Sequence, residues 1–88
     1  MDKILVKNKD YIWEPFDDEL VLLNLTDGQQ HIFNAVARSF FQKIDGKRKV
    51  DEIFDLMLVE FEVEREVLEK DFEALTKSLL DKEIICLR

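Results

Sequence analysis

The chain has 88 residues, 47% of them hydrophobic and nine of them aromatic, and a formal net charge of −7. This length fits one domain, expected to span residues 1–88, and the apolar content is too high for an intrinsically disordered protein. The acidic balance counts against a surface that binds the phosphates of nucleic acid.

The N-terminal segment, residues 1–13, carries charges at positions 2, 3, 7, 9 and 10. It therefore lacks an apolar run long enough for a signal peptide or a membrane span. Cys86 is the only cysteine, which excludes an internal disulfide and suits a reducing compartment. We expect a cytoplasmic protein that does not bind membranes.

Three strands are expected in the first part of the chain. YIWEPF, residues 11–16, is rich in aromatic and β-branched residues, and Pro15 confines this strand to the edge or an end of a sheet. After an Asp-Asp turn, ELVLLNL, residues 19–25, has apolar side chains on both faces. A turn containing Gly28 then returns the chain as QQHIF, residues 29–33. The pattern predicts a three-stranded antiparallel sheet.

A helix is expected to follow the third strand directly. Asn34 is a suitable N-cap, because its side-chain oxygen can accept a hydrogen bond from a backbone N–H one turn into the helix. Apolar residues then recur at helical spacing: Val36, Ala37, Phe40, Phe41 and Ile44. Gly46 supplies the left-handed residue expected to end this helix.

A second helix is expected to begin near Val50, after the basic turn of residues 47–49. Its apolar residues fall in one sector at about 100° per residue: Val50, Ile53, Phe54, Met57, Leu58 and Phe61. Leu56 and Val59 lie on the opposite face. They form either a modestly apolar surface or a contact with a second copy or a partner.

The third helix, about residues 64–81, is expected to bury four apolar residues: Leu68, Phe72, Leu75 and Leu79. A polar row with a spacing of seven residues interrupts this apolar sector: Glu64, Asp71 and Ser78. Asp71 has two possible roles. It either accepts hydrogen bonds from a neighbouring loop or pairs with one of the basic side chains of residues 47–49, or it belongs to the wall of a groove that admits a partner. Residues 83–87 form a short β-like tail.

The negative charge is concentrated in one segment. Residues 51–71 contain nine acidic and two basic side chains, a net charge of −7, while the rest of the chain is neutral. This segment is either an ordinary solvated helix face or a field that repels phosphates and attracts basic partners.

Catalytic and metal-binding motifs are absent from the sequence. His31 is the only histidine and Cys86 the only cysteine, and they lie far apart in the sequence. These residues do not supply the ligands of a zinc site or a Cys/His nucleophilic pair. Gly28 and Gly46 are isolated turn residues and do not form a phosphate loop. We expect no enzyme activity, no metal and no cofactor.

The fold class expected is α+β, a winged helix-turn-helix-like arrangement of a three-stranded antiparallel sheet followed by three helices. Its acidic helices argue against DNA as the partner.

Residues 19–85 resemble the PqqD-like family, the pyrroloquinoline quinone biosynthesis protein D group. The matching features are an apolar strand and glycine turn, an aromatic residue before Asn34, the Asp45-Gly46 pair, Val50 with Glu52-Ile53, and Asp71 ahead of Leu75. The resemblance implies a recognition element for ribosomally made and then modified peptides (a RiPP recognition element). Such a domain captures the leader segment of a precursor peptide, holds no cofactor, and presents the peptide to a modifying enzyme, often a radical S-adenosylmethionine protein.

In this family the leader adds as a strand beside the third strand and packs against the third helix. The resemblance therefore implies a groove between residues 29–33 and the helix that holds Asp71. The residues themselves agree, since QQHIF has no proline and no formal charge to guard an exposed edge. That edge could instead be covered by the chain's own tail or by a second copy. The expected peptide-binding residues are Gln29, Gln30, His31, Ile32, Phe33, Glu64, Val67, Leu68, Asp71, Phe72 and Leu75.

The alternative function is a structural or regulatory dimer or adaptor module. It would use Leu56, Val59 and the open strand to contact a second copy. The expected partners under the leading hypothesis are a precursor peptide and a modifying enzyme, with the chain itself a monomer or a weak homodimer.

Overall fold

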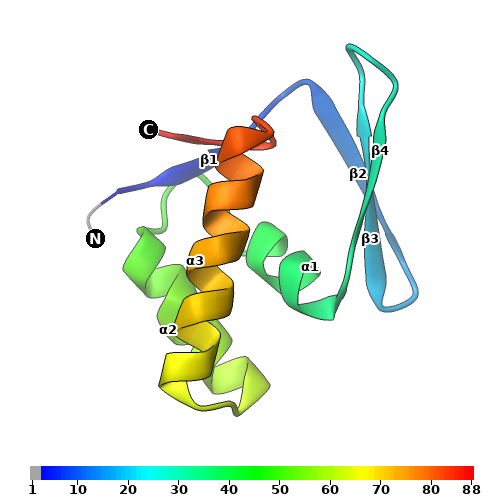
Figure 1. Cartoon of the computed structure of the whole chain (residues 1–88). Coiled ribbons are helices and arrows are strands. Elements are labelled where there is room, and N and C mark those ends of the chain that lie inside the picture. The colour runs from blue at the N-terminus through cyan, green and yellow to red at the C-terminus, as the bar shows by residue number, and fades with distance from the viewer. Residues whose placement is uncertain (1–2) are drawn as a thin grey trace.

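The computed structural model describes residues 3–88, which form five strands and three helices. In chain order these are β1 (Leu5–Lys7), β2 (Tyr11–Phe16), β3 (Glu19–Asn24), β4 (Gln30–Phe33), α1 (Ala35–Gln42), α2 (Val50–Phe61), α3 (Arg65–Asp81) and β5 (Ile85–Leu87). The helices form one group, and the sheet of β2, β3 and β4 stands beside α1 (Figure 1). No helix within residues 3–88 combines the length and the apolar composition needed to cross a membrane.

The three-stranded sheet has the predicted antiparallel order β2-β3-β4. The Leu25 N–H donates to the Asp10 carbonyl at 2.7 Å, which makes that pair hydrogen-bonded. Because hydrogen-bonded and non-hydrogen-bonded residue pairs alternate along antiparallel strands, Pro15 and Leu20 form a non-hydrogen-bonded pair. Its missing N–H therefore faces the open edge of β2, where a proline is tolerated.

A second, two-stranded sheet joins the chain ends. β1 pairs antiparallel with β5 in the register Leu5↔Leu87, Val6↔Cys86, Lys7↔Ile85. The predicted β-like tail is confirmed as β5, whereas the sequence pattern did not predict β1. The tail thus lies on β1 and leaves β4 uncovered (Figure 1).

The N-cap predicted for α1 is confirmed, because Asn34 Oδ1 accepts a hydrogen bond from the Ala37 N–H at 2.9 Å. Gly46 is left-handed as predicted, with a φ of 78°, but the prediction that it ends this helix is wrong, since α1 ends at Gln42 with Lys43 as its C-cap. The Asp45 side chain instead accepts the N–H groups of the two residues after Gly46, at 2.9 and 2.8 Å, and forms a separate turn. These hydrogen bonds hold the pKa of the Asp45 carboxyl below its usual range.

Phe40 and Phe41 of α1 connect the sheet to the helices. Consecutive helical residues diverge by about 100°, so the two rings pack in different directions. Phe40 meets Phe72 of α3 with ring centroids 5.1 Å apart. Phe41 meets Phe33 of β4 at 5.8 Å and Trp13 of β2 at 5.7 Å. Both phenylalanines are buried, and they fix the position of α3 relative to β4.

A polar contact ties α1 to α2. Lys43 Nζ donates to Ser39 Oγ at 2.7 Å and to Glu60 Oε1 at 2.6 Å. The hydrogen bond from Lys43 lowers the pKa of the Glu60 carboxyl. Ser39 is buried and is satisfied by this contact, so the cluster has a structural role.

Candidate functional site

A groove of about 670 Å³ lies between β4 and α3. One wall is β4 itself, and the facing wall is the part of α3 that runs from Asp71 to the residue after its end, Lys82. Val36 and Ala37 from the start of α1 also line it. The groove lies where the family resemblance implies a binding site.

The edge of β4 that faces this groove is unpaired. β3 pairs with the other edge, and β5 pairs with β1, so no strand within residues 3–88 occupies it. The Asn24 N–H donates to the Gln29 carbonyl at 2.9 Å, which makes that pair hydrogen-bonded. Because hydrogen-bonded and non-hydrogen-bonded pairs alternate along the two strands, the N–H and C=O groups of Gln30 and Ile32 point away from β3, toward the open edge. Their N–H and C=O groups can therefore pair with an added strand.

The side chains of β4 alternate between two environments. Phe33 is buried against Phe41, and His31 is half-buried with its ring centroid 6.0 Å from that of Tyr11. Tyr11 in turn donates a hydrogen bond to the Lys82 carbonyl at 3.2 Å, which ties β2 to the residue that follows α3. Ile32 is 64% exposed and lies on the opposite face of the sheet.

Asp71 is an exposed residue of the α3 wall. The structure gives it no hydrogen bond and no ion pair with any of residues 3–88, so the expected alternative of a contact with a neighbouring loop or with residues 47–49 is not observed. Arg48 pairs instead with Asp45, with 3.8 Å between Arg48 Nη1 and Asp45 Oδ2. The Asp71 carboxylate is thus available to a ligand in the groove.

The expected site residues fall into three groups. Gln30, His31, Ile32, Phe33, Asp71 and Leu75 line the groove. Leu68 and Phe72 are buried, with exposed fractions of 3% and 5%, and they support the wall from behind. Gln29, Glu64 and Val67 lie outside the lining.

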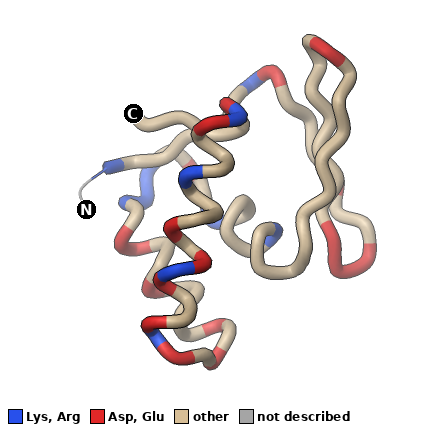
Figure 2. Tube along the Cα trace, viewed as in Figure 1, with Lys and Arg blue, Asp and Glu red and all other residues tan. Residues whose placement is uncertain are grey.

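Several residues of the α3 wall were not among the expected peptide-binding residues, although Ser78 was noted in the polar row with Asp71. Ala74, Ser78 and Lys82 line the groove together with Asp71 and Leu75. Steps of three and four residues from Asp71 place all of them on one helix face, so the spacing alone could have identified them. The acidic segment of residues 51–71 lies mainly on α2 and the first half of α3 (Figure 2).

Comparison with known proteins places this geometry in context. Residues 19–85 match the family described as coenzyme PQQ synthesis protein D (PqqD). The chain is also 35% identical over 54 residues to a PqqA binding protein of Gluconobacter oxydans (strain 621H). That alignment covers 61% of this chain and 56% of the relative, so the chain spans about half the relative's length.

Two solved structures share the fold. One is TbiB1 in complex with the TbiA(beta) leader peptide, with a TM-score of 0.81 and 26% identity over 91% of this chain and 93% of that chain. The other is a lasso peptide synthetase B1 complexed with the leader peptide, with a TM-score of 0.80 and 23% identity over 93% and 96% of the two chains. The fold class expected from the sequence is confirmed.

Proposed function

The chain belongs to the PqqD family, and from that premise we propose that it is a non-catalytic peptide chaperone. It binds the leader segment of a ribosomally made precursor peptide and presents the peptide to a modifying enzyme, a radical S-adenosylmethionine protein, in the cytoplasm. The observation that carries the proposal is the unpaired edge of β4 facing α3 across a groove. The curated relative is named for binding PqqA, and the first structural neighbour carries a leader peptide, which supports the same function.

The leader binds as a fourth strand of the sheet. Its main chain pairs with the N–H and C=O groups of Gln30 and Ile32, about 4.8 Å from β4. Alternate leader side chains then enter the groove and contact Val36 and Leu75. Apolar side chains suit these positions, because burial of apolar area offsets the entropy lost when a disordered peptide becomes ordered.

The proposal is tested by titrating the chain into a fluorescein-labelled leader peptide, taken from the short precursor gene nearest to its own gene. Fluorescence anisotropy should show saturable binding to a monomeric chain. Sedimentation of the unliganded chain tests the dimer module, for which the exposed Leu56 and Val59 are available. A stable dimer that does not bind the leader would contradict the leader-binding function and favour the alternative.

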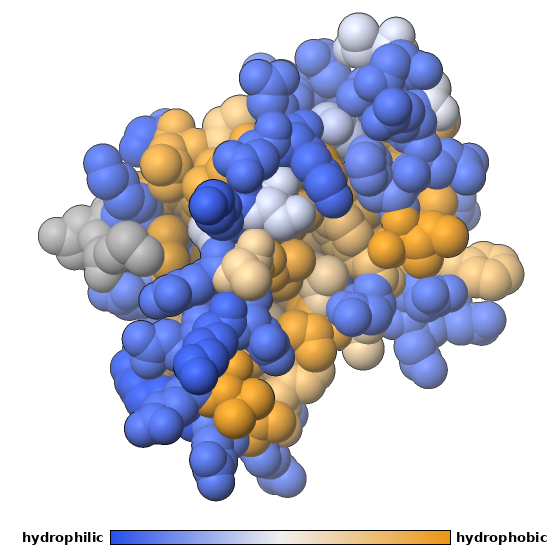
Figure 3. All heavy atoms as spheres, viewed as in Figure 1, coloured by the Kyte–Doolittle hydropathy of each residue, from blue (hydrophilic) through white to orange (hydrophobic). Residues whose placement is uncertain are grey.

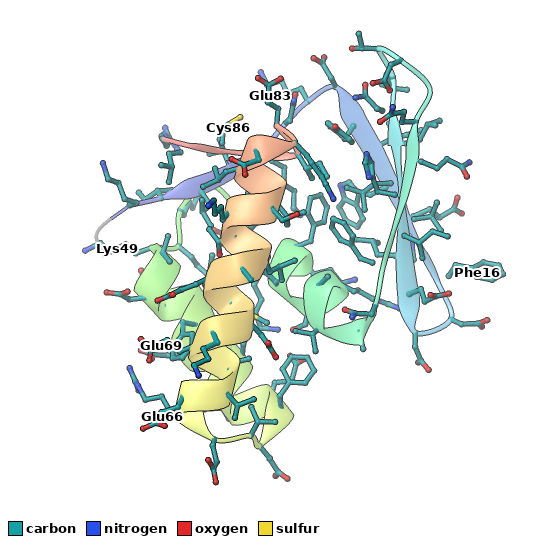
Figure 4. All side chains as sticks on the ribbon, viewed as in Figure 1. Phe16, Lys49, Glu66, Glu69, Glu83 and Cys86 are labelled. Carbon is teal, nitrogen blue, oxygen red and sulfur yellow. The ribbon has the colours of Figure 1, made fainter. Side chains whose placement is uncertain are left out.

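Reversing the charge of Asp71 should weaken leader binding. Asp71→Lys removes the unpaired carboxylate from the groove wall and places a flexible cation there, and we expect a loss of affinity of about tenfold, or ~1.4 kcal/mol. Glu69→Lys is the matched control, because this exposed residue lies on the face of α3 turned away from the groove and the net charge changes equally (Figure 4). Equal affinities of the two folded variants would show that Asp71 does not contact the leader.

A further inference from the structure

The face of the sheet turned away from the helices is apolar. Strand register and alternation place five apolar side chains on this outer face: Ile12, Phe16, Val21, Leu23 and Ile32. Ile12, Phe16 and Ile32 are 52%, 66% and 64% exposed. Figure 4 shows Phe16 directed away from the helices, and Figure 3 shows hydrophobic atoms at the surface over the sheet.

An antiparallel sheet with one solvated face normally carries polar residues on that face. Here a hollow of about 380 Å³ opens on the outer face, lined mainly by Ile12, Phe16, Val21 and Leu23. Apolar residues that are contiguous across three strands mark an interaction site more often than an ordinary surface. This surface lies across the sheet from the helices and meets the groove only along β4, where Gln30 lines both the hollow and the groove and Ile32 of the outer face also lines the groove.

The charges on the outer face have one sign. Glu14 of β2 and Glu19 of β3 lie among the apolar residues, and β2, β3 and β4 contain neither lysine nor arginine. Figure 2 shows further acidic residues in the turn between β2 and β3. Arg38 reaches that turn from α1, but its guanidinium donates to the backbone carbonyls of Asp17 and Glu19 and not to a carboxylate.

These charges select against a second copy of the chain as the occupant. Two outer faces packed together would enclose the Glu14 carboxylates of both copies in an apolar contact that offers no cation. Burying a charge without a partner is unfavourable. The complementary surface is apolar and carries lysine or arginine opposite Glu14 and Glu19.

We propose that the outer face docks the modifying enzyme through an apolar surface bordered by basic side chains; this rests on the proposed leader-binding function. A leader paired with β4 extends the same sheet by one strand. Its side chains that do not enter the groove therefore continue the outer face next to Ile32. An enzyme docked there contacts the domain and the leader together, so each ligand raises the affinity for the other.

The test measures two affinities for the full chain and its variants. The probes are the purified radical S-adenosylmethionine enzyme encoded nearest to this gene, with and without saturating leader, and the labelled leader alone. Phe16→Ser and Glu14→Lys each change an exposed side chain, so the fold is retained. Each should lower the affinity for the enzyme by about tenfold and change the leader affinity by less than about twofold. Val59→Ser is the control, because Val59 is 79% exposed on α2, away from the sheet.

The outcomes separate the two proposals. Lack of leader binding by the unmodified chain contradicts the proposed function. The docking surface alone is overturned if the chain binds the leader but does not bind the enzyme. It is also overturned if Phe16→Ser and Glu14→Lys leave the affinity for the enzyme unchanged. The docking surface is also wrong if Val59→Ser weakens enzyme binding as strongly, or if the unmodified chain forms a dimer that Phe16→Ser dissociates.

Discussion

Replacing Ile32 by proline is expected to lower leader affinity by about a hundredfold, or ~2.8 kcal/mol, while the chain remains folded. The Ile32 N–H points to the open edge, so a proline there removes no hydrogen bond of the β3–β4 ladder. It does remove a donor to the added strand, leaves a leader carbonyl unsatisfied, and places a ring at the pairing edge. Fluorescence anisotropy with the labelled leader measures the loss.

Ile32→Thr is the matched control for this variant. It keeps the N–H and a β-branched side chain, and that side chain lies on the outer face, where it borders the added strand without pointing into the groove. Its leader affinity should stay within about twofold of the unmodified chain, since the pairing groups are unchanged. If the folded proline variant bound the leader as tightly as the threonine variant, main-chain pairing at β4 would be excluded as the mode of binding.

Truncation of Phe40 should cause a large loss of stability. Phe40 is fully buried, and its ring meets Phe72 of α3 in an edge arrangement at 5.1 Å. Phe40→Ala therefore leaves a cavity between α1 and α3, which costs about 3 to 5 kcal/mol in the free energy of unfolding. In a domain of this size the melting temperature falls by roughly 4 to 8 °C per kcal/mol, which thermal unfolding followed by circular dichroism will detect.

The same substitution at an exposed phenylalanine controls for the change of residue type. Phe16 is 66% exposed on the outer face, so Phe16→Ala should change the free energy of unfolding by less than about 0.5 kcal/mol. Similar losses for Phe40→Ala and Phe16→Ala would contradict the packing between α1 and α3 that holds the groove wall in place.

Local signals were sufficient to predict most of the fold. The strand pattern of residues 19–25, the turn at Gly28 and the cap at Asn34 each depend on neighbours within a few residues, and all three lie where they were expected. The unpaired third strand could also be proposed, because QQHIF lacks the charges and prolines that usually guard an edge.

The features that were missed depend on distant contacts. β1 has only three residues, Leu5–Lys7, and its partner β5 lies near the other end of the chain, so no local period reveals it. Ile44 has helical spacing and is buried, yet it lies beyond the end of α1. The helix end was missed because the spacing of apolar residues does not show where a hydrogen-bonded turn replaces a helix.

The groove was predicted more accurately in location than in its individual residues. Leu68 and Phe72 share the apolar sector of α3 with Leu75, but the first two are buried in the core and only Leu75 reaches the groove. A helical period gives the direction of a side chain and not the element that it meets. The division between wall and core depends on how α1 and α2 pack against α3, which the sequence of α3 alone does not specify.

Amide hydrogen exchange at β4, measured by nuclear magnetic resonance with and without the leader, tests strand addition most directly. In the free chain the amides of His31 and Phe33 should be protected by β3, while those of Gln30 and Ile32 should exchange rapidly. Saturating leader should protect Gln30 and Ile32 and leave the other two amides unchanged. Protection of Gln30 and Ile32 in the free chain, or rapid exchange of both in the leader complex, would contradict binding at this edge.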